Sequence, residues 1–283
     1  YGSRAIAMVR NNKEELNRNF SEILSIHIIF SIIVIFVYLV LLFFFVEDNL
    51  VIFLIQSIYV FAAVFDINWF FFGIEKFKLT VGRNTLVKIL SVFLVLVFVK
   101  TQTDLWIYAL ILALSVFVGQ SVVWFALKQY VSWRRPSWAN MKQHIRPLFV
   151  LFLPILALSL YKYMDKIMLG SISSNVQVGF YENAEKIINV PMSLIMAFGV
   201  VLMPRIANMV TSKDKGEVFK LIDMSMEAVM LLAIAISFGL AGISFVLAPI
   251  FFGYEFEECG ILIMGLAVTV PFMAFANVIR TQY

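Results

Sequence analysis

Charged residues are scarce in this sequence, and that scarcity already limits the class of protein. Asp, Glu, Lys and Arg make up 14% of the 283 residues, whereas soluble proteins carry about 25%. Hydrophobic residues make up 62%, against about 45–50% in soluble proteins. A chain this apolar cannot cover a water-facing surface, so lipid must be its solvent. The composition excludes a cytosolic enzyme and a disordered chain.

Metal-ligating and nucleophilic residue types are also few. The chain has one cysteine, Cys259, and two histidines, His27 and His144. A single cysteine cannot form an intrachain disulfide, which excludes a disulfide scaffold. Two histidines and one cysteine do not make a zinc site of the usual composition. The sequence contains no P-loop and no nucleophile elbow. We therefore expect no enzyme, no cofactor and no metal.

Long apolar runs take up most of the chain. A helix needs about 20 apolar residues to cross the hydrocarbon core. Eight runs reach or approach this length: Ile23–Val46, Val51–Gly73, Leu86–Val99, Leu105–Leu127, Leu148–Leu169, Val176–Met203, Val229–Phe252 and Gly260–Ile279. The third is short, and we expect it to extend backward through Asn84. The sequence predicts an all-α polytopic membrane protein with about eight transmembrane helices.

The basic residues lie in alternate loops. Eighteen of the 22 Lys and Arg residues fall in the segments 1–22, 74–88, 128–146 and 204–220 and at Arg280. The loops on the opposite side carry acidic residues instead: Glu47, Asp48, Asp104, Glu255, Glu257 and Glu258. Basic loops face the cytoplasm in membrane proteins. We therefore predict a cytoplasmic first loop, and these charges require no nucleic acid as a partner.

The longest predicted cytoplasmic connection runs from Lys128 to Arg146 and contains Pro136. Its charge, tryptophans and proline are typical of a hinge or an interfacial segment. It predicts two lobes of four helices each, over residues 1–135 and 136–283. The sequence starts at Tyr1 rather than Met, which is the pattern expected for an internal piece of a longer protein.

One acidic residue lies inside the second apolar run. A continuous helix through "FDINWFFFGIEKF" places Asp66 on one stripe with four other residues, Tyr59, Ala62, Phe70 and Gly73. Ionisable groups at membrane depth usually face a cavity or a partner. Asp66 therefore either lines a cavity as a proton or cation site, or makes an interhelical hydrogen bond with no transport role.

A larger group of charges lies where the fifth and sixth runs meet, in "YKYMDKIMLG" and "GFYENAEKIINVP". Its members are Lys162, Asp165, Lys166, Glu182, Glu185 and Lys186. Counting about 1.5 Å per residue from a loop at 171–175 places Lys162 level with Glu185. We predict that Lys162 reaches Glu182 or Glu185. The group forms either a polar vestibule or a structural ion-pair cluster near the outer interface, with Lys166 snorkelling.

Several stretches together resemble one family, the Wzx-type flippases of polysaccharide repeat units, in the multidrug and oligosaccharidyl-lipid exporter superfamily. They are "YGSRAIAMVRNNKEELNRNF", "FDINWFFFGIEKFKLTVGRN", "LFLPILALSLYKYMDKIMLGSISSNVQVGFYENAEKIINVP" and "VLMPRIANMV". The resemblance implies a two-lobed exporter in the bacterial plasma (inner) membrane. It implies alternating access that moves an undecaprenyl-pyrophosphate-linked oligosaccharide from the cytoplasmic to the outer leaflet.

The implied substrate assigns roles to the charged residues. Lys162, Lys166 and Lys186 are the candidates for pairing with the pyrophosphate, and Arg83 and Arg205 for the cytoplasmic mouth. Asp66, Asp165, Glu182 and Glu185 complete the set of candidate cavity residues. The expected partners are the lipid-linked oligosaccharide, membrane lipid, a coupling proton or sodium ion and a polysaccharide polymerase.

Three other functions fit an apolar polytopic chain. A drug–cation antiporter of the same architecture predicts an acid-dominated cavity, against which the three lysines argue. A membrane-embedded polymerase or ligase needs a large outer loop with catalytic groups, and the predicted outer loops are short. A scaffold of a polysaccharide synthesis complex without transport activity stays open on the sequence alone.

The predicted topology can be tested by labelling single cysteines with an impermeant reagent in a Cys259→Ser background. The cytoplasmic positions are Asn12, Arg134 and Lys213, and the external positions are Asp48, Ser173 and Glu257. Intact cells should be labelled only at the external positions. Labelling of a cysteine at Arg134 from outside would contradict the predicted orientation.

Overall fold

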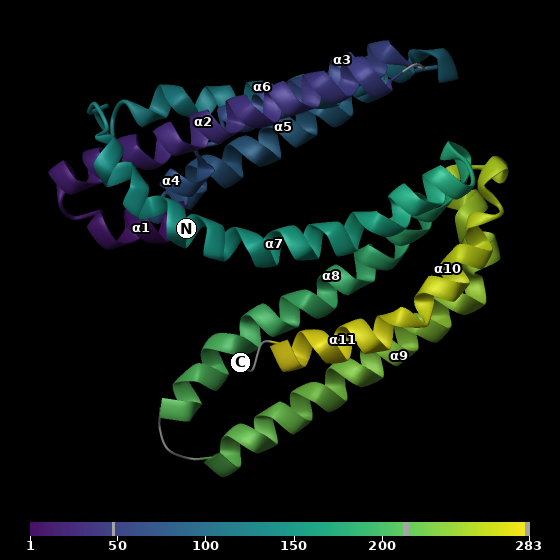
Figure 1. Cartoon of the computed structure of the whole chain (residues 1–283). Helices are drawn as coiled ribbons and strands as arrows, with labels where there is room; N and C mark the ends of the chain where they lie inside the picture. The colour runs from purple at the N-terminus through teal and green to yellow at the C-terminus, as the bar shows by residue number, and fades with distance from the viewer. Residues whose placement is uncertain (47–48, 212–214, 281–283) are drawn as a thin grey trace. The chain divides into compact units, whose positions relative to one another are not determined.

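The computed structural model describes the backbone of residues 1–46, 49–211 and 215–280, and the side chains in these ranges except 45, 198–211, 215–221 and 280. Every regular element in these ranges is helical, so the all-α prediction is confirmed (Figure 1). The chain divides into two compact units, Tyr1–Leu156 and Ala157–Tyr283. The division falls inside one helix, and the lobes 1–135 and 136–283 stay a prediction.

The first unit is built from two short helices, a set of longer helices and the start of a helix that continues beyond it. Its helices are α1 (Gly2–Val9), α2 (Lys13–Phe45), α3 (Leu50–Val64), α4 (Asn68–Gly73), α5 (Phe77–Phe98), α6 (Leu105–Leu127) and the first part of α7 (Trp138–Ile172). α2 begins where Asn12 Oδ1 accepts hydrogen bonds from two backbone amides of the first turn. Such a cap satisfies donors that have no partner inside the helix.

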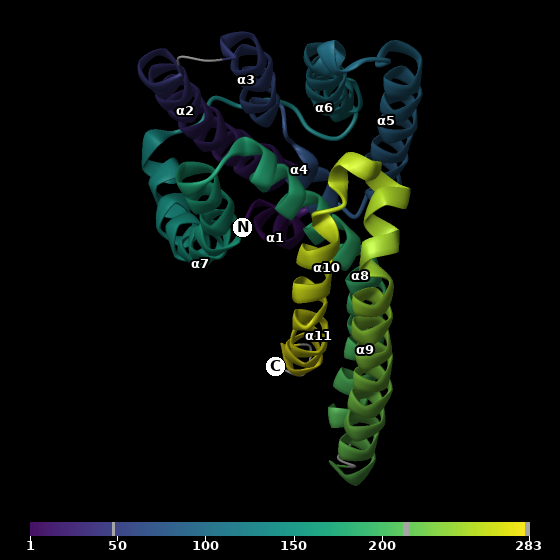
Figure 2. The same ribbon diagram turned by 90° about the vertical axis from the view of Figure 1, so that its right-hand side faces the viewer.

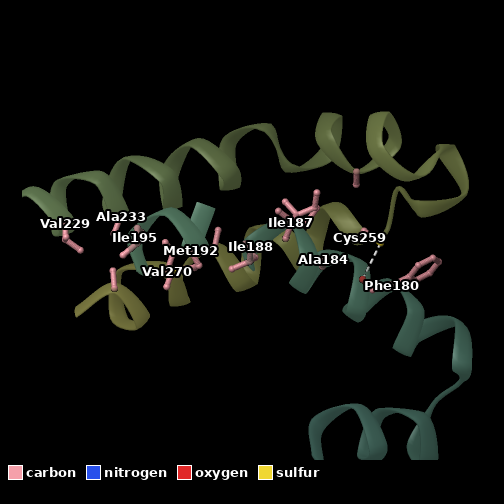
Figure 3. Packing of buried hydrophobic residues seen from close by; sticks show 14 of the residues in the cluster. Phe180, Ala184, Ile187, Ile188, Met192, Ile195, Val229, Ala233, Cys259 and Val270 are labelled. Carbon is pink, nitrogen blue, oxygen red and sulfur yellow. Dashed lines mark hydrogen bonds between the residues drawn. The ribbon is translucent and has the colours of Figure 1, made fainter. Parts of the chain in front are cut away.

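The second unit contains the rest of α7 and the helices α8 (Asn175–Thr211), α9 (Lys215–Phe252), α10 (Cys259–Ala267) and α11 (Thr269–Arg280). Its buried core joins α8, α9, α10 and α11 through small and aliphatic side chains such as Ala184, Ala233 and Ile263 (Figure 3). The views in Figures 1 and 2 agree that α11 runs along α9. Cys259 Sγ donates to the Phe180 carbonyl oxygen at 3.5 Å.

Six helical segments in the described residues are long and apolar enough to cross a membrane, or seven with the bent pair α10–α11. They are Lys13–Phe44, Leu50–Gly73, Phe77–Phe98, Gln102–Leu127, Trp138–Ile172 and Ile222–Phe252. The third extends backward as predicted, and the sixth predicted span lies on α8, partly outside the described side chains. Many apolar side chains on these helices are exposed, as lipid contact requires. The chain is a multi-pass membrane protein.

The second span is interrupted, contrary to the predicted continuous stripe. The backbone leaves the helix at 65–67 between α3 and α4, so Asp66 does not continue one helical face from Tyr59 to Gly73. Backbone groups freed at membrane depth need partners inside the protein. Trp124 Nε1 donates to the Phe65 carbonyl at 2.9 Å, and His27 Nε2 donates to the Ala63 carbonyl at 2.8 Å. These side chains stabilise a break that the apolar pattern does not reveal.

The basic connection before α7 is fastened to α2. Asn17 Oδ1 accepts a hydrogen bond from the Ser132 amide at 2.9 Å, and Ser21 Oγ accepts one from the Arg134 amide at 2.9 Å. Both acceptor residues are buried. The segment predicted as a hinge or interfacial piece is therefore held to α2 by hydrogen bonds from its backbone amides to two α2 side chains.

Close packing of α1 on α4 depends on Gly73. An ideal Cβ at this position would lie 2.6 Å from Ile6 Cβ and 2.8 Å from the Ser3 carbonyl oxygen. We expect Gly73→Ala to lower the free energy of unfolding by about 1–3 kcal/mol, because neither contact can yield without moving α1. Denaturant unfolding in detergent measures the effect. Gly82→Ala on α5 is the matched control, since nothing lies within 4 Å of its Cβ position; equal stability of the two variants would contradict the packing.

Candidate functional site

The first polar cluster joins the end of α7 to the start of α8. Lys166 Nζ lies 2.5 Å from Glu182 Oε2 and 2.7 Å from Glu185 Oε2. Glu182 and Glu185 are three residues apart, so both face the same neighbour on a helix. The Lys166 side chain is 14% exposed. This ammonium group is therefore neutralised inside the protein by two carboxylates.

A hydrogen bond of Asp165 adds a second link across the same hairpin. Tyr181 OH donates to Asp165 Oδ2 at 2.6 Å. Tyr181 lies next to Glu182 in the sequence. It was not predicted as a site residue, because an aromatic residue near a helix end is common in an apolar run. The tyrosine and the ion pairs together fix the register of α7 against α8.

The predicted contact of Lys162 with these acids is wrong, because Lys166 makes it instead. α7 continues to Ile172 and α8 begins at Asn175. The residue of α7 that lies level with Glu182 and Glu185 is therefore Lys166, which is about one helical turn closer to the α7–α8 turn than Lys162. Lys162 is exposed, and its Nζ lies 5.7 Å from the centroid of the Tyr163 ring. Lys186 is also exposed and donates to Asn183 Oδ1 at 3.5 Å.

The second polar cluster surrounds Arg83 on α5. Arg83 NH1 donates to the Gly119 carbonyl at 2.8 Å and to Gln120 Oε1 at 3.3 Å. Arg83 NH2 donates to Asn68 Oδ1 at 3.0 Å and to Asn84 Oδ1 at 2.6 Å. Asn68 and Gln120 also bond to each other at 3.1 Å. The guanidinium is thus held by neutral oxygens from α4, α5 and α6.

The interruption of the second span places Asn68 in this cluster. Asp66 Oδ1 accepts the Asn68 backbone amide at 2.9 Å, which fixes the chain where α4 begins. Asp66 lies close enough to Arg83 for a Coulombic interaction, but Arg83 has no carboxylate within 4 Å among the described residues. Asp66 and Arg83 were predicted as site residues from the sequence, whereas Asn68 and Gln120 were not. The signal for Gln120 was a lone amide inside the run Leu105–Leu127.

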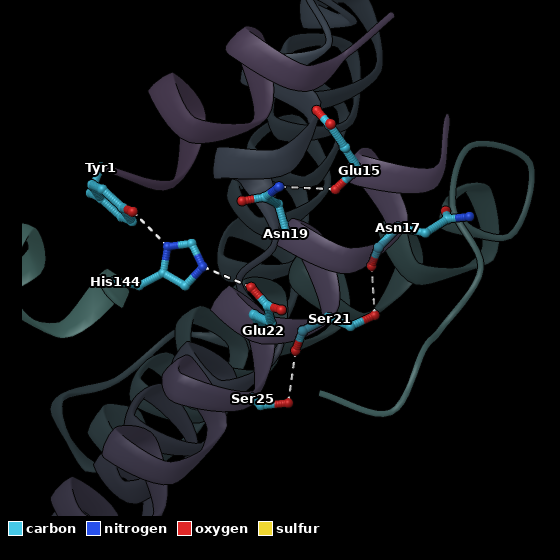
Figure 4. A network of polar contacts seen from close by, with 8 residues as sticks. All are labelled: Tyr1, Glu15, Asn17, Asn19, Ser21, Glu22, Ser25 and His144. Atoms are coloured by element: carbon cyan, nitrogen blue, oxygen red, sulfur yellow. Dashed lines mark hydrogen bonds and ion pairs between the residues drawn. The ribbon is translucent and has the colours of Figure 1, made fainter. Parts of the chain in front are cut away.

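A third polar cluster was not predicted at all. Tyr1, Glu22 on α2 and His144 on α7 form a chain of hydrogen bonds within the first unit (Figure 4). Burial and the nearby Glu22 carboxylate raise the pKa of the Tyr1 hydroxyl. Glu22 and His144 were counted with the polar loops that flank the apolar runs, so nothing in the sequence brought them together.

The predicted site residues therefore fall into two groups, one in each compact unit. Asp66 and Arg83 belong to the first unit, and six residues belong to the second: Lys162, Asp165, Lys166, Glu182, Glu185 and Lys186. Arg205 lies on α8, but its side chain is outside the described residues. The structure brings three of the second group, Lys166, Glu182 and Glu185, into direct ionic contact.

The fold and these clusters define a helical multi-pass membrane protein with cationic side chains on its candidate spans. Residues 2–210 match the family described as "Polysaccharide biosynthesis protein", and the chain belongs to this family. The match confirms at the level of the family the resemblance seen in the sequence. No solved structure matches the chain.

Two curated relatives extend this comparison. A "Putative O-antigen transporter" of Shigella dysenteriae is 24% identical over 273 residues, which cover 91% of this chain and 65% of the relative. A protein of the same name from Escherichia coli strain K12 is 26% identical over 218 residues, which cover 76% of this chain and 52% of the relative. This chain spans less than two thirds of the length of either relative.

The double ion pair of Lys166 can be tested by removing its partners. Glu182→Gln and Glu185→Gln should each cost little alone, because the other carboxylate remains. Together they should destabilise the protein by about 1–2 kcal/mol, between the values for exposed and buried pairs. Unfolding in detergent measures the loss, and Lys166→Met in the double variant should recover it. Glu255→Gln, an exposed acid of the same unit, is the control; additive losses without recovery would contradict the pairing.

Proposed function

We propose that this chain is part of a transporter that flips undecaprenyl-pyrophosphate-linked oligosaccharide repeat units from the cytoplasmic to the outer leaflet of the bacterial plasma membrane. The first loop of the chain lies in the cytoplasm. Two lobes, 1–135 and 136–283, alternate in opening a path to either side. Membership in the polysaccharide biosynthesis family and the transporter name of both relatives support this proposal.

The chemistry of the cargo sets what such a protein must supply. A sugar headgroup with a pyrophosphate carries many hydroxyl groups and negative charge, and hydrocarbon offers no hydrogen-bond partner to either. The prenyl tail can stay in the bilayer while the headgroup crosses. The protein therefore has to present polar groups and cations at membrane depth. These groups must bind other protein groups when the site is empty and the sugar headgroup and pyrophosphate when it is loaded.

The surroundings of Arg83 are the observation that carries the proposal. Its guanidinium lies within the span Phe77–Phe98 and is bonded to four neutral oxygens. Neutral acceptors orient the group without cancelling its charge. Arginine is also the residue that best binds phosphate oxygens in pairs. The resemblance implied a place for Arg83 at the cytoplasmic mouth; on these contacts we assign it to pairing with the pyrophosphate.

The lysines of the second unit divide into two kinds. Lys166 is held between Glu182 and Glu185 and so has its charge cancelled in the resting protein. Lys162 and Lys186 are exposed and make no ion pair among the described residues. We assign anion pairing to Lys162 and Lys186, and positioning of the α7–α8 hairpin to Lys166.

The balance of charge separates this function from that of a cation antiporter. The α7–α8 group holds three lysines and three acids, so it has no excess of carboxylates to bind a cationic drug. The proposal also includes a proton or a sodium ion as the coupling ion. A polysaccharide polymerase is the partner that would consume the flipped repeat unit.

Arg83→Gln in the full-length protein should lower export of lipid-linked sugar about tenfold or more, which corresponds to the loss of one charge-assisted contact. Arg83→Lys should retain part of the activity, because lysine keeps the positive charge but lacks the paired N–H donors of the guanidinium. Export is measured per molecule of folded protein in the membrane. Lys88→Gln, an exposed cation on the same helix, is the matched control. Unchanged export per molecule in Arg83→Gln would overturn the assignment of Arg83.

Lys162→Ala should lower export per folded molecule while membrane insertion stays intact, and Lys162→Arg should keep part of the activity. The reason is that an exposed lysine without a carboxylate partner contributes little to folding. If Lys162 is only structural, both variants reduce the amount of protein and leave export per molecule constant. Quantitative blotting beside the export assay separates these outcomes.

A further inference from the structure

Three segments meet at a buried chain of titratable side chains near the start of α7 (Figure 4). Tyr1 OH lies 2.6 Å from His144 Nδ1, and His144 Nε2 lies 3.0 Å from Glu22 Oε2. The Glu22 side chain is 1% exposed and the His144 side chain is 4% exposed. All three residues belong to the first compact unit, so this cluster is independent of the polar group on α7 and α8.

The hydrogen bonds of Glu22 are incomplete. Glu22 Oε1 is buried and has no hydrogen-bond partner. With a neutral imidazole, His144 Nε2 donates to Glu22 and His144 Nδ1 accepts from the Tyr1 hydroxyl. A carboxylate in that state carries a full buried charge with one donor, and an uncompensated buried charge is expensive.

No fixed cation relieves this charge in the described part of the chain. Near this end of the three surrounding helices, the other ionisable groups are Arg4 on α1, Arg10 directly after α1, Lys13, Glu14, Glu15, Arg18 and His27 on α2, and Lys142 and Arg146 on α7. None of them forms an ion pair with Glu22 or His144. Arg10 pairs with Glu75, and Glu14 pairs with Arg134. The remaining way to neutralise the cluster is a proton.

We propose that Glu22, His144 and Tyr1 form a proton-binding site. One proton from water enters the cluster, either on the imidazole or on the carboxylate. On the imidazole it forms an ion pair with Glu22, and His144 Nδ1–H then donates to the Tyr1 oxygen. On the carboxylate it leaves a neutral acid beside a neutral imidazole. Both arrangements change the net charge of the cluster from −1 to zero without breaking a covalent bond.

The site connects protonation to the attachment of α7. His144 lies in the second turn of α7, whereas Glu22 lies on α2, and α7 continues past Leu156 out of the first unit. The proton therefore stabilises the docking of the first turns of α7 on α2. Loss of the proton leaves a buried negative charge, which favours separation of the two helices. This inference does not rest on the proposed transport function.

Hydrogen–deuterium exchange of residues 138–146 in the full-length protein tests the site. One linked proton changes an opening equilibrium by at most about tenfold per pH unit. As the pH rises above the ordinary histidine pKa of about 6.5, protection corrected for intrinsic exchange should fall, because the folded cluster keeps a proton that the opened chain has lost. Glu22→Gln should not show this fall, and its protection should hold or rise with pH, because the buried His144 then has no carboxylate to stabilise its charged form. Glu15→Gln on the same helix should behave as the parent protein.

Two results would overturn the proposal. One is protection in the parent protein that does not change with pH, and the other is an unchanged pH dependence in Glu22→Gln. If Glu22→Gln fails to fold, His144→Gln takes its place: the proton can then bind only to the Glu22 carboxylate, so the pH at which protection falls should shift. The exchange experiment measures no transport, so its failure leaves the flippase proposal untouched, and failure of export assays leaves the proton site untouched.

Discussion

The constraint on which this structure depends is that hydrocarbon offers no partner to a polar group, so the protein must supply one. The interrupted second span shows this directly. At the end of α3, the Phe65 carbonyl accepts from Trp124, and the Ala63 carbonyl accepts from His27 as well as from the Asp66 amide; the two side chains come from two other helices. The irregular backbone then delivers Asn68 to Arg83. The break in the second span thus contributes to a polar site formed by α4, α5 and α6.

Lys166 and Arg83 both need polar partners within the protein, but their partners differ in charge. This difference gives the two residues different roles. The charge of Lys166 is neutralised by two carboxylates, and these ion pairs join α7 to α8. Arg83 is oriented by amide and carbonyl oxygens and keeps its charge. A cation that stays paired with carboxylates cannot bind an anionic substrate, whereas a cation held only by neutral oxygens can. The proposed flippase function therefore rests on Arg83 more than on the lysine and glutamate pairs.

The sequence predicted the helices well, because apolar length and the positions of charged loops determine them almost alone. It did not predict the break at 65–67, since "FDIN" sits in an apolar run and its stabilising donors come from distant helices. The ion pair was assigned to Lys162 rather than Lys166 because the pairing depends on where a two-residue turn falls. Glu22 and His144 are 122 positions apart, and no local pattern joins them.

Reconstitution of the full-length protein in liposomes with a fluorescent undecaprenyl-pyrophosphate-linked repeat unit tests the central claim most directly. The fraction of headgroups reached by an impermeant quencher or enzyme reports translocation between leaflets. The proposed function predicts that the protein makes the labelled headgroup cross much faster than in protein-free liposomes, and that a headgroup lacking pyrophosphate crosses poorly. Equal rates with and without the protein would contradict it.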